Sequence, residues 1–446
     1  MVTTSHPAPP GGPAQKTPGW RMRWLPELRR SEMWTYFGPA FVASVAYIDP
    51  GNFAANIEGG TRFGYKLLWV LLWSNAMAIL VQYLSAKLGI VSGHTLPQNC
   101  RRHFSRPATI GLWVAAEISA IATDLAEFLG AALGFYLLFG AHFLALGWDK
   151  THIMLLAALL TSICVFLILA LDMYGFRYIE WAIMAFVSAI AFCYAIEVFL
   201  VHPDWKLAAF HSLVPILDRS SLYVAVAMLG ATVMPHVVYL HSALVQPRLK
   251  QASANCPTGR SLFVHRYLRF ELLDVFIAMN GAWLINSAMI LMAAAAFAHL
   301  GGVVPTIEEA HRTLGPLLGP LAATAFAVAL LCSGLSSSTV GTMAGQVIIE
   351  GFLDIRFPVF LRRLITIIPA VVIIAIGLDP LRILLLSQVV LSFTLPFALV
   401  PLIILTSRSS VMAGFANGTS AKVLGWLTTG IIVLLNALLL AQLLHG

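Results

Sequence analysis

Long apolar stretches, separated by short polar connections, run from about Tyr36 to the end of the chain. Many of them reach the ~20 residues that an α-helix needs to cross the hydrocarbon core of a bilayer. We predict eleven spans, at about 36–58, 66–88, 110–140, 152–171, 178–201, 222–245, 272–299, 317–349, 361–377, 382–405 and 421–444. The pattern therefore predicts an all-α polytopic membrane protein, whose third and eighth spans extend beyond the bilayer.

Two spans are interrupted near their middles, the first by DPGN at 49–52 and the sixth by MPH at 234–236. Proline has no N–H and cannot continue the helical ladder. Backbone groups freed at that depth are tolerated only where they line a cavity or bind something. We therefore expect helices 1 and 6 to be unwound at mid-membrane, which is typical of the substrate site of a transporter.

Spans one to five and six to ten form two sets of five. Because five is odd, the second set enters the membrane from the opposite side. This predicts a 5+5 inverted repeat in which the two breaks are equivalent.

Composition sharpens the assignment, because 59% of the residues are hydrophobic and only 11% are charged. A soluble domain has about 25% charged residues. We expect residues 1–35, which are basic and rich in Pro and Gly, to be a disordered cytoplasmic tail, and residues 36–446 to be the transmembrane domain. The five cysteines lack metal-site spacing and are expected to be free.

Most of the 27 Lys and Arg residues fall on the inner side if the N-terminus is cytoplasmic, and the odd span count then puts the C-terminus outside. The net charge of +7 follows from this topology and from contact with anionic lipids, so no nucleic-acid partner is expected. The short loops and tails favour a bacterial inner membrane.

The residues at the two breaks are of metal-ligand type. A carboxylate inside a span normally faces a cavity. The candidate ligands are the side chains of Asp49, Asn52 and Met234 and the backbone carbonyls of Ala46, Tyr47 and Ala231. Oxygen ligands alone suit Mg²⁺ or Ca²⁺, whereas a thioether shifts the preference towards Mn²⁺, Fe²⁺ and later transition metals. A plainer alternative is that Asp49 lies in a turn and Met234 fills the core, but their joint placement favours a site.

The third span carries Glu117, Asp124 and Glu127 along one helical face. Rows of acids inside a membrane are typical of proton relays or ion paths. Arg362 and Arg363 begin the ninth span and are candidate counter-charges. The alternative is that these acids form buried ion pairs that only fix helix packing.

Three further polar residues lie within predicted spans. His236 adjoins the second break and titrates near neutral pH, so it is either a proton carrier or a hydrogen-bonded core histidine. For His241 we favour a structural role. Gln82 makes either an interhelical hydrogen bond or a contact near the metal.

At these residues the chain resembles the Nramp family of proton-coupled divalent metal transporters, in particular its bacterial manganese branch. The resemblance rests on DPGN at 49–52, GATVMPH at 230–236, YLHS at 239–242, and GLSSS at 334–338 continuing to GTMAG at 341–345. It runs from about Gly38 to the end of the chain.

The resemblance implies a LeuT-like fold and import of Mn²⁺ or Fe²⁺ with protons by alternating access, without an enzymatic activity or a bound cofactor. It implies metal binding by the side chains of Asp49, Asn52 and Met234 and the carbonyls of Ala46 and Ala231, and closure of the occluded site by Gln388. It also implies a proton network between spans three and nine. Val237, where many members have Asn, and Lys87 depart from the family pattern.

Three other classes of function are alternatives to this interpretation. One is a passive channel: the paired proline breaks favour gating around a fixed site, but only flux kinetics exclude a pore. LeuT-like carriers of amino acids or organic cations use the same two breaks, but Asp49 would repel a substrate carboxylate. An intramembrane metalloenzyme would need a motif such as HExxH or GxSxG, and none is present.

Overall fold

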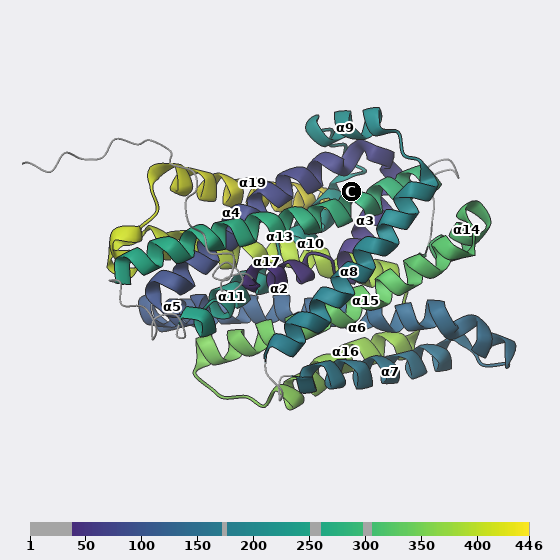
Figure 1. Cartoon of the computed structure of the whole chain (residues 1–446), viewed down its shortest axis with the longest axis horizontal. Coiled ribbons are helices and arrows are strands. Elements are labelled where there is room, and N and C mark those ends of the chain that lie inside the picture. The colour runs from purple at the N-terminus through teal and green to yellow at the C-terminus, as the bar shows by residue number, and fades with distance from the viewer. Residues whose placement is uncertain (1–37, 172–175, 250–259, 298–305, 446) are drawn as a thin grey trace, which may run out of the picture. The chain divides into compact units, whose positions relative to one another are not determined.

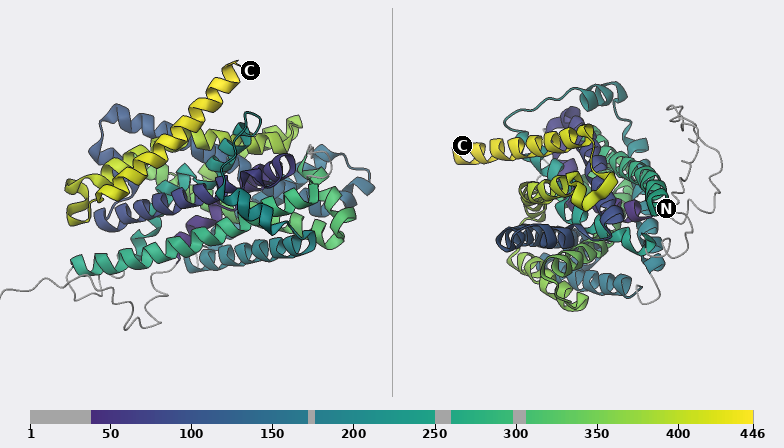
Figure 2. Two further views of the ribbon diagram at one scale, coloured as in Figure 1. Left: turned by 90° about the horizontal axis from the view of Figure 1, so that it is seen from above. Right: turned by 90° about the vertical axis from the view of Figure 1, so that its left-hand side faces the viewer.

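The computed structural model describes residues 38–171, 176–249, 260–297 and 306–445. The predicted tail at 1–35 and Cys256 lie outside these residues. Cys100, Cys164, Cys193 and Cys332 are free, as expected. The described chain is almost entirely helical, and Figures 1 and 2 show most of its long helices running in broadly the same direction.

The first predicted span is two helices, α2 (Pro39–Ala46) and α3 (Pro50–Phe63), and the sixth is α10 (Leu222–Thr232) followed by α11 (Pro235–Leu244). Both breaks are therefore present at the predicted positions. The other long helices are α4 (Leu68–Ser92), α6 (Arg106–Ala145), α7 (Lys150–Ala170), α8 (Phe176–Val201), α13 (Arg260–Phe297), α15 (Pro320–Leu353), α16 (Val359–Ile376), α17 (Pro380–Ser407) and α19 (Thr419–His445). Shorter helices, α5 (Leu96–His103), α9 (Trp205–Leu213), α14 (Ile307–Leu318) and α18 (Ser409–Met412), connect them.

Ten helical stretches of the described residues are long and apolar enough to cross a membrane. One of them, Pro50–Ser92, contains both α3 and α4, so the broken first span is not counted separately. The seventh span was predicted too short, because α13 begins at Arg260 and not at 272. The first turns of α13 carry Arg266 and Arg269, and charged residues are typical of the connections between spans.

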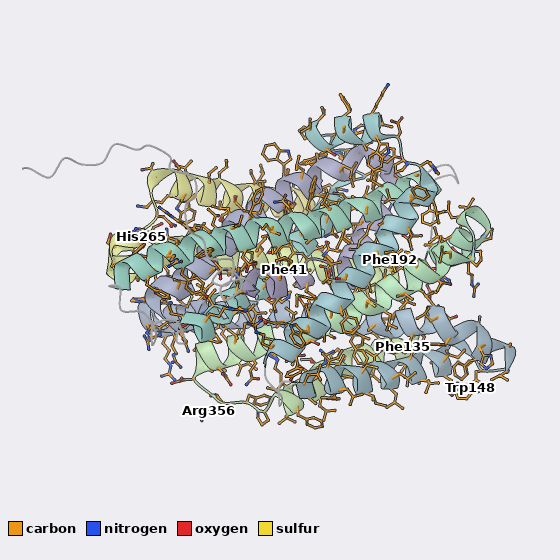
Figure 3. All side chains as sticks on the ribbon, in the orientation of Figure 1. Phe41, Phe135, Trp148, Phe192, His265 and Arg356 are labelled. Atoms are coloured by element: carbon orange, nitrogen blue, oxygen red, sulfur yellow. The ribbon has the colours of Figure 1, made fainter. Side chains whose placement is uncertain are left out.

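The exposed surface of these helices is rich in large apolar side chains, as a lipid-facing surface requires. Phe192 on α8 is 68% exposed and Phe199 is 75% exposed. Figure 3 shows Phe192, and also Trp148 at the turn between α6 and α7. Polar side chains are instead gathered inside the helix bundle, where they must find partners.

Helices α6 and α15 pack along each other and approach closely through glycines (Figure 1). A Cβ on Gly134 of α6 would lie 2.7 Å from the backbone of Leu331, and a Cβ on Gly334 of α15 would lie 2.5 Å from the backbone of Ala131. Small residues are what allow helix backbones to approach in a membrane. This contact holds the acidic face of α6 against α15.

Lys87, which departs from the family pattern, has a structural partner. Its Nζ donates to Asn417 Oδ1 at 2.8 Å, and Asn417 donates through Nδ2 to Thr406 Oγ1. Lys87 therefore ties α4 to the connection between α17 and α19.

We predict that Gly134→Ala destabilises the protein by about 1–3 kcal/mol, because the added methyl group overlaps the backbone of α15. Thermal unfolding in detergent measures this change. Gly111→Ala is the matched control, since Gly111 lies on the same helix and its Cβ would meet no atom within 4 Å. Equal melting temperatures for the two variants would contradict the close packing of α6 on α15.

Candidate functional site

The first break follows from two local features. Pro50 occupies the first helical position of α3, and the side chain of Asp49 caps that helix by accepting a hydrogen bond from the Asn52 backbone N–H at 2.8 Å. Aspartate as N-cap followed by proline is a favoured way to begin a helix. The same proline removes the N–H that would have bonded the Ala46 carbonyl. The sequence thus ends one helix and starts the next within three residues.

The second break repeats this chemistry. Pro235 begins α11 with Met234 as its N-cap, and it removes the N–H that would have bonded the Ala231 carbonyl. Ala46 and Ala231 are therefore equivalent carbonyls, each four residues before a proline. All the residues from 222 to 242 of this segment are buried except Tyr223.

The two breaks meet through Asn52. Its Nδ2 donates both to Asp49 Oδ1 at 2.7 Å and to Ala231 O at 2.9 Å, so one nitrogen lies between a carboxylate oxygen and a freed carbonyl. Asp49 and Asn52 are fully buried. The predicted ligands Asp49, Asn52 and Ala231 are thus brought together, and Met234 follows Ala231 by three residues, also fully buried.

Gln388 of α17 lies against both breaks. A Cβ on Gly51 would lie 1.8 Å from Gln388 Nε2, and a Cβ on Gly230 would lie 2.1 Å from the Gln388 carbonyl. Only glycine leaves room for this side chain and this backbone. Three buried side-chain oxygens here have no hydrogen-bond partner among the described residues: Asp49 Oδ2, Asn52 Oδ1 and Gln388 Oε1.

The Tyr47 carbonyl, also predicted as a ligand, accepts a hydrogen bond from Asn286 Nδ2 of α13 at 2.6 Å. The Ile48 carbonyl accepts one from Ser333 of α15. The surrounding helices thus hold the unwound chain in place and leave the Ala46 carbonyl as the better candidate in this break.

Gln82 and His241 belong to a buried chain of hydrogen bonds that starts at the first break. Gln82 Nε2 donates to the Tyr47 hydroxyl at 2.7 Å, Gln82 Oε1 lies 2.9 Å from His241 Nδ1, and His241 Nε2 lies 2.9 Å from Glu271 Oε1. The chain links α4, α11 and α13. It gives Gln82 the interhelical hydrogen bond that was one of its two predicted roles.

The sequence reasoning missed Glu271 and Asp274 of α13. Asp274 Oδ2 accepts from the backbone N–H groups of Gly38 and Ala40 and so caps the first turn of α2. Both acids were placed at the edge of the predicted seventh span. Their spacing of three, on one helical face, was the available signal.

His236 connects the second break to the acidic helix. Its Nδ1 lies 3.0 Å from Thr123 Oγ1 of α6, and the Thr123 hydroxyl already donates to the Ser119 carbonyl. Thr123 therefore accepts from His236 Nδ1–H, because a hydroxyl has one proton to donate. His236 Nε2 has no partner among the described residues and is left able to accept a proton.

The predicted acidic face of α6 meets the two arginines of α16. Arg363 Nη1 lies 3.0 Å from Asp124 Oδ1, and Arg362 Nη2 lies 3.4 Å from Glu117 and 3.9 Å from Asp124. Asp124 and both arginines are buried, and Glu117 is partly exposed. The alternative that Asp124 forms a buried ion pair agrees with this geometry.

Glu127 behaves differently from Asp124. It is fully buried, it forms none of the ion pairs of the described residues, and neither of its oxygens has a hydrogen-bond partner there. A Cβ on Gly341 would lie 2.4 Å from Glu127 Oε2, so the carboxyl group rests against α15. One turn further on, Gly130 packs directly on Pro50. The acidic face of α6 therefore runs from the first break to the partly exposed Glu117.

Within the described residues, no three His, Cys, Asp or Glu side chains form a metal-binding group. A site at the breaks must therefore combine Asp49 with amide, carbonyl and thioether donors. Such a set lacks the Cys and His ligands that structural and catalytic zinc sites use.

We predict that Arg363→Met destabilises the protein by about 3–5 kcal/mol, because it leaves the buried Asp124 without its nearest counter-charge. Thermal unfolding in detergent measures the loss. The double variant Arg363→Met with Asp124→Leu removes both charges and is expected to recover most of the stability. A double variant as unstable as the single one would show that the pairing of these two residues is not what matters.

Comparisons with known proteins agree with this architecture. The family model Nramp, described as natural resistance-associated macrophage protein-like, matches residues 40–442. The divalent metal cation transporter MntH of Caldanaerobacter subterraneus subsp. tengcongensis is 48% identical over 413 residues, which cover 92% of this chain and 94% of that protein. The Bacillus subtilis protein of the same name is 45% identical over 408 residues, covering 91% and 92%.

Solved structures show the same relationship. The Eremococcus coleocola manganese transporter, in complex with an aromatic bis-isothiourea substituted compound, superposes with a TM-score of 0.79 at 35% identity, covering 92% of this chain and 87% of that one. Mhp1, a nucleobase-cation-symport-1 family transporter, has a TM-score of 0.55 at 12% identity, covering 91% and 92%, and shares the fold alone. The predicted LeuT-like fold class is confirmed, whereas the internal repeat stays a prediction. With the family model matching almost the whole of the span-bearing region, the chain belongs to the Nramp family of membrane transporters.

Proposed function

We propose that the protein carries divalent transition-metal cations, Mn²⁺ and Fe²⁺ above all, across the membrane together with protons. The observation that supports this most directly is the place of Asn52 Nδ2. It lies between Asp49 Oδ1 and Ala231 O, where a cation would satisfy both oxygens at once. Relatives named divalent metal cation transporter support the same substrate class.

Binding needs only a small rearrangement of Asn52. A half-turn of its amide brings Oδ1, which has no partner, to the side of Asp49 and Ala231. Asp49 then supplies the negative charge, and Asn52, Ala46 and Ala231 supply neutral oxygens. Gln388, which lies against the first break, adds a free oxygen when the site closes.

Met234 is the proposed source of selectivity. Ca²⁺ and Mg²⁺ prefer oxygen ligands and, in part, retained water, whereas a thioether is a soft donor that Mn²⁺, Fe²⁺ and later metals accept. A buried thioether therefore does not replace the water ligands that Ca²⁺ and Mg²⁺ would lose on entering the site, and the site disfavours these abundant ions. The donor set ranks Mn²⁺ and Fe²⁺ above those ions and leaves their mutual order open.

Protons take a route separate from that of the metal in this proposal. A dication at Asp49 repels a proton there, and the proton moves to the neighbouring buried groups. His236 Nε2 is free to accept it. Glu127 is a second acceptor, because it lies one helical turn from Gly130, which packs on Pro50. Asp124, paired with Arg363, and Glu117, paired with Arg362, continue the route towards solvent.

Alternating access follows from the same breaks. The helices α2 and α3 are joined by three residues outside either helix, and α10 and α11 by two. Each member of a pair can therefore move without the other. The ligands are fully buried, which describes an occluded arrangement. We further propose a bacterial inner membrane, contact with anionic lipids, a cytoplasmic N-terminus and an external C-terminus.

Uptake into liposomes tests the substrate. The parent protein is expected to take up Mn²⁺ saturably and to take up neither amino acids nor organic cations. Met234→Ala is expected to weaken Mn²⁺ uptake about ten-fold, as loss of a metal-site residue commonly does, and to admit more Ca²⁺ and Mg²⁺.

Met228→Ala is the matched control, because it removes a buried thioether of α10 that lies against Gly59. Unchanged discrimination in Met234→Ala would rule out the thioether as the selectivity element. Amino-acid uptake without Mn²⁺ uptake would rule out the metal carrier itself.

Proton movement is tested separately by Asp124→Asn. The variant keeps the shape of the side chain but cannot carry the charge, so metal-driven proton flux is expected to fall about 100-fold, in the range found when a positioned proton-transfer group is lost. A pH-sensitive dye inside the liposomes measures the flux, and calorimetry measures Mn²⁺ binding, which is expected to survive. Glu58→Gln, at a partly buried residue of α3 that is paired with the exposed Arg62, is the control. Normal proton flux in Asp124→Asn would remove Asp124 from the route.

A further inference from the structure

Glu197, near the end of α8, is a buried acid that the proposed mechanism does not use. It is fully buried, and neither carboxyl oxygen has a hydrogen-bond partner among the described residues. It also forms none of the ion pairs found there. The other acid of α8, Glu180, pairs with Arg248 at 2.8 Å. Glu197 therefore lacks the ion pair or hydrogen bond that normally accompanies a buried acid.

The groups around Glu197 offer no positive charge. Tyr194 lies one turn earlier on the same face, buried and with an unpartnered hydroxyl, and Cys193 beside it lies near Cys332 of α15. Helices α15, α13, α2 and α7 pack against α8. Five charged or titratable side chains of these helices have partners of their own. They are Glu350 with Gln346, Glu271 with His241, Asp274 with the first turn of α2, Lys150 with Glu308, and His152 with Asp149.

An ionised carboxylate without a counter-charge or a donor is very costly in such an interior, so the carboxyl group is neutral when it is enclosed in this way. Figure 3 shows that Phe192 lies on α8 as well, and its side chain is largely exposed, whereas Glu197 is on the inward face. Glu197 thus holds a proton inside the bundle.

An aromatic contact links this acid to the helix that carries the metal ligands. The Tyr194 ring packs edge-on against Phe53 with centroids 5.4 Å apart, and Phe53 packs in the same way against Phe326 of α15 at 6.3 Å. Phe53 directly follows Asn52 on α3. A movement of α3 away from α8 would therefore separate Phe53 from Tyr194 and expose Glu197 to water.

This cluster lies away from the acidic face of α6. On α15, Gly341 rests against Glu127 and Phe326 rests against Phe53, and fifteen residues, or about 22 Å of helix, separate these two points. The backbone contacts of Gly134 and Gly334 lie between them. Glu197 is therefore on the opposite side of the metal site from Glu127.

We propose that Glu197 is a second proton-binding site, which takes up a proton from water when α3 closes against α8 and returns it to water when α3 opens. The inference rests on the transport function proposed above. Each closure then consumes one proton from the compartment that α3 faces. The ratio of closed to open protein falls about ten-fold for each unit by which the pH of that compartment rises, over the range in which exposed Glu197 is ionised.

Two measurements on the full-length protein test the site. In infrared difference spectra, the parent protein is expected to show a protonated-carboxyl band that Glu197→Gln lacks. In liposomes, Glu197→Gln is expected to take up Mn²⁺ at low external pH at the parent rate. As the external pH rises, uptake by the variant is expected to fall less steeply than uptake by the parent. The two slopes are expected to differ by up to about ten-fold per pH unit. Glu350→Gln, on α15 and hydrogen-bonded to Gln346, is the matched control and is expected to keep the parent profile.

Absence of the infrared difference would show that Glu197 is ionised and would overturn the proposal. A normal infrared difference with an unchanged pH profile would also overturn it, because the proton would then be permanently held. If the parent protein takes up no Mn²⁺ at any pH, the transport function fails, and the infrared comparison made at low and high pH still decides whether Glu197 exchanges its proton.

Discussion

The structure depends on two missing backbone hydrogen bonds. Pro50 and Pro235 each remove the N–H that a carbonyl four residues earlier would have used, and those carbonyls belong to Ala46 and Ala231. In lipid such groups must be satisfied by protein or by a bound group. The surrounding helices supply partners for the neighbouring carbonyls of Tyr47 and Ile48, and the side chain of Asn52 supplies one for Ala231. The breaks are thus stable only inside a bundle that closes around them.

Buried charge is the second constraint, and the bundle meets it in two ways. Asp124 is paired with Arg363, and His241 is in contact with Glu271, so these polar groups are stabilised by direct partners. Asp49 is hydrogen-bonded to Asn52 but has no counter-charge, and Glu127 has neither a counter-charge nor a hydrogen bond among the described residues. A group of the first kind holds helices together, whereas a group of the second kind is free to exchange its proton or bind a cation.

The close packing of α6 on α15 connects these two constraints. Gly130 lets α6 touch Pro50, and Gly334 lets α15 touch Ala131, so the acidic face and the first break are separated by no intervening side chain. In the proposed mechanism, a proton that leaves Asp49 therefore finds titratable groups within the same packed layer. The proposed metal ligands and the acids lie on different helices, which is the physical basis for proposing separate routes for the two ions.

The sequence alone determined the helical fold class, the positions of nearly all the spans and both breaks, because apolar length and proline chemistry act locally. It also indicated Asp49, Asn52 and the acids of α6 as candidate functional residues, since charged and strongly polar side chains are rare inside apolar spans. Only the tertiary structure decided which of these groups have partners. Asp124 and Glu127 are equivalent in the sequence, yet only Asp124 faces an arginine, and Glu271 and Glu197 gain significance only from the helices packed against them. Partnership depends on contacts between residues distant in the chain, and helical periodicity carries no information about those contacts.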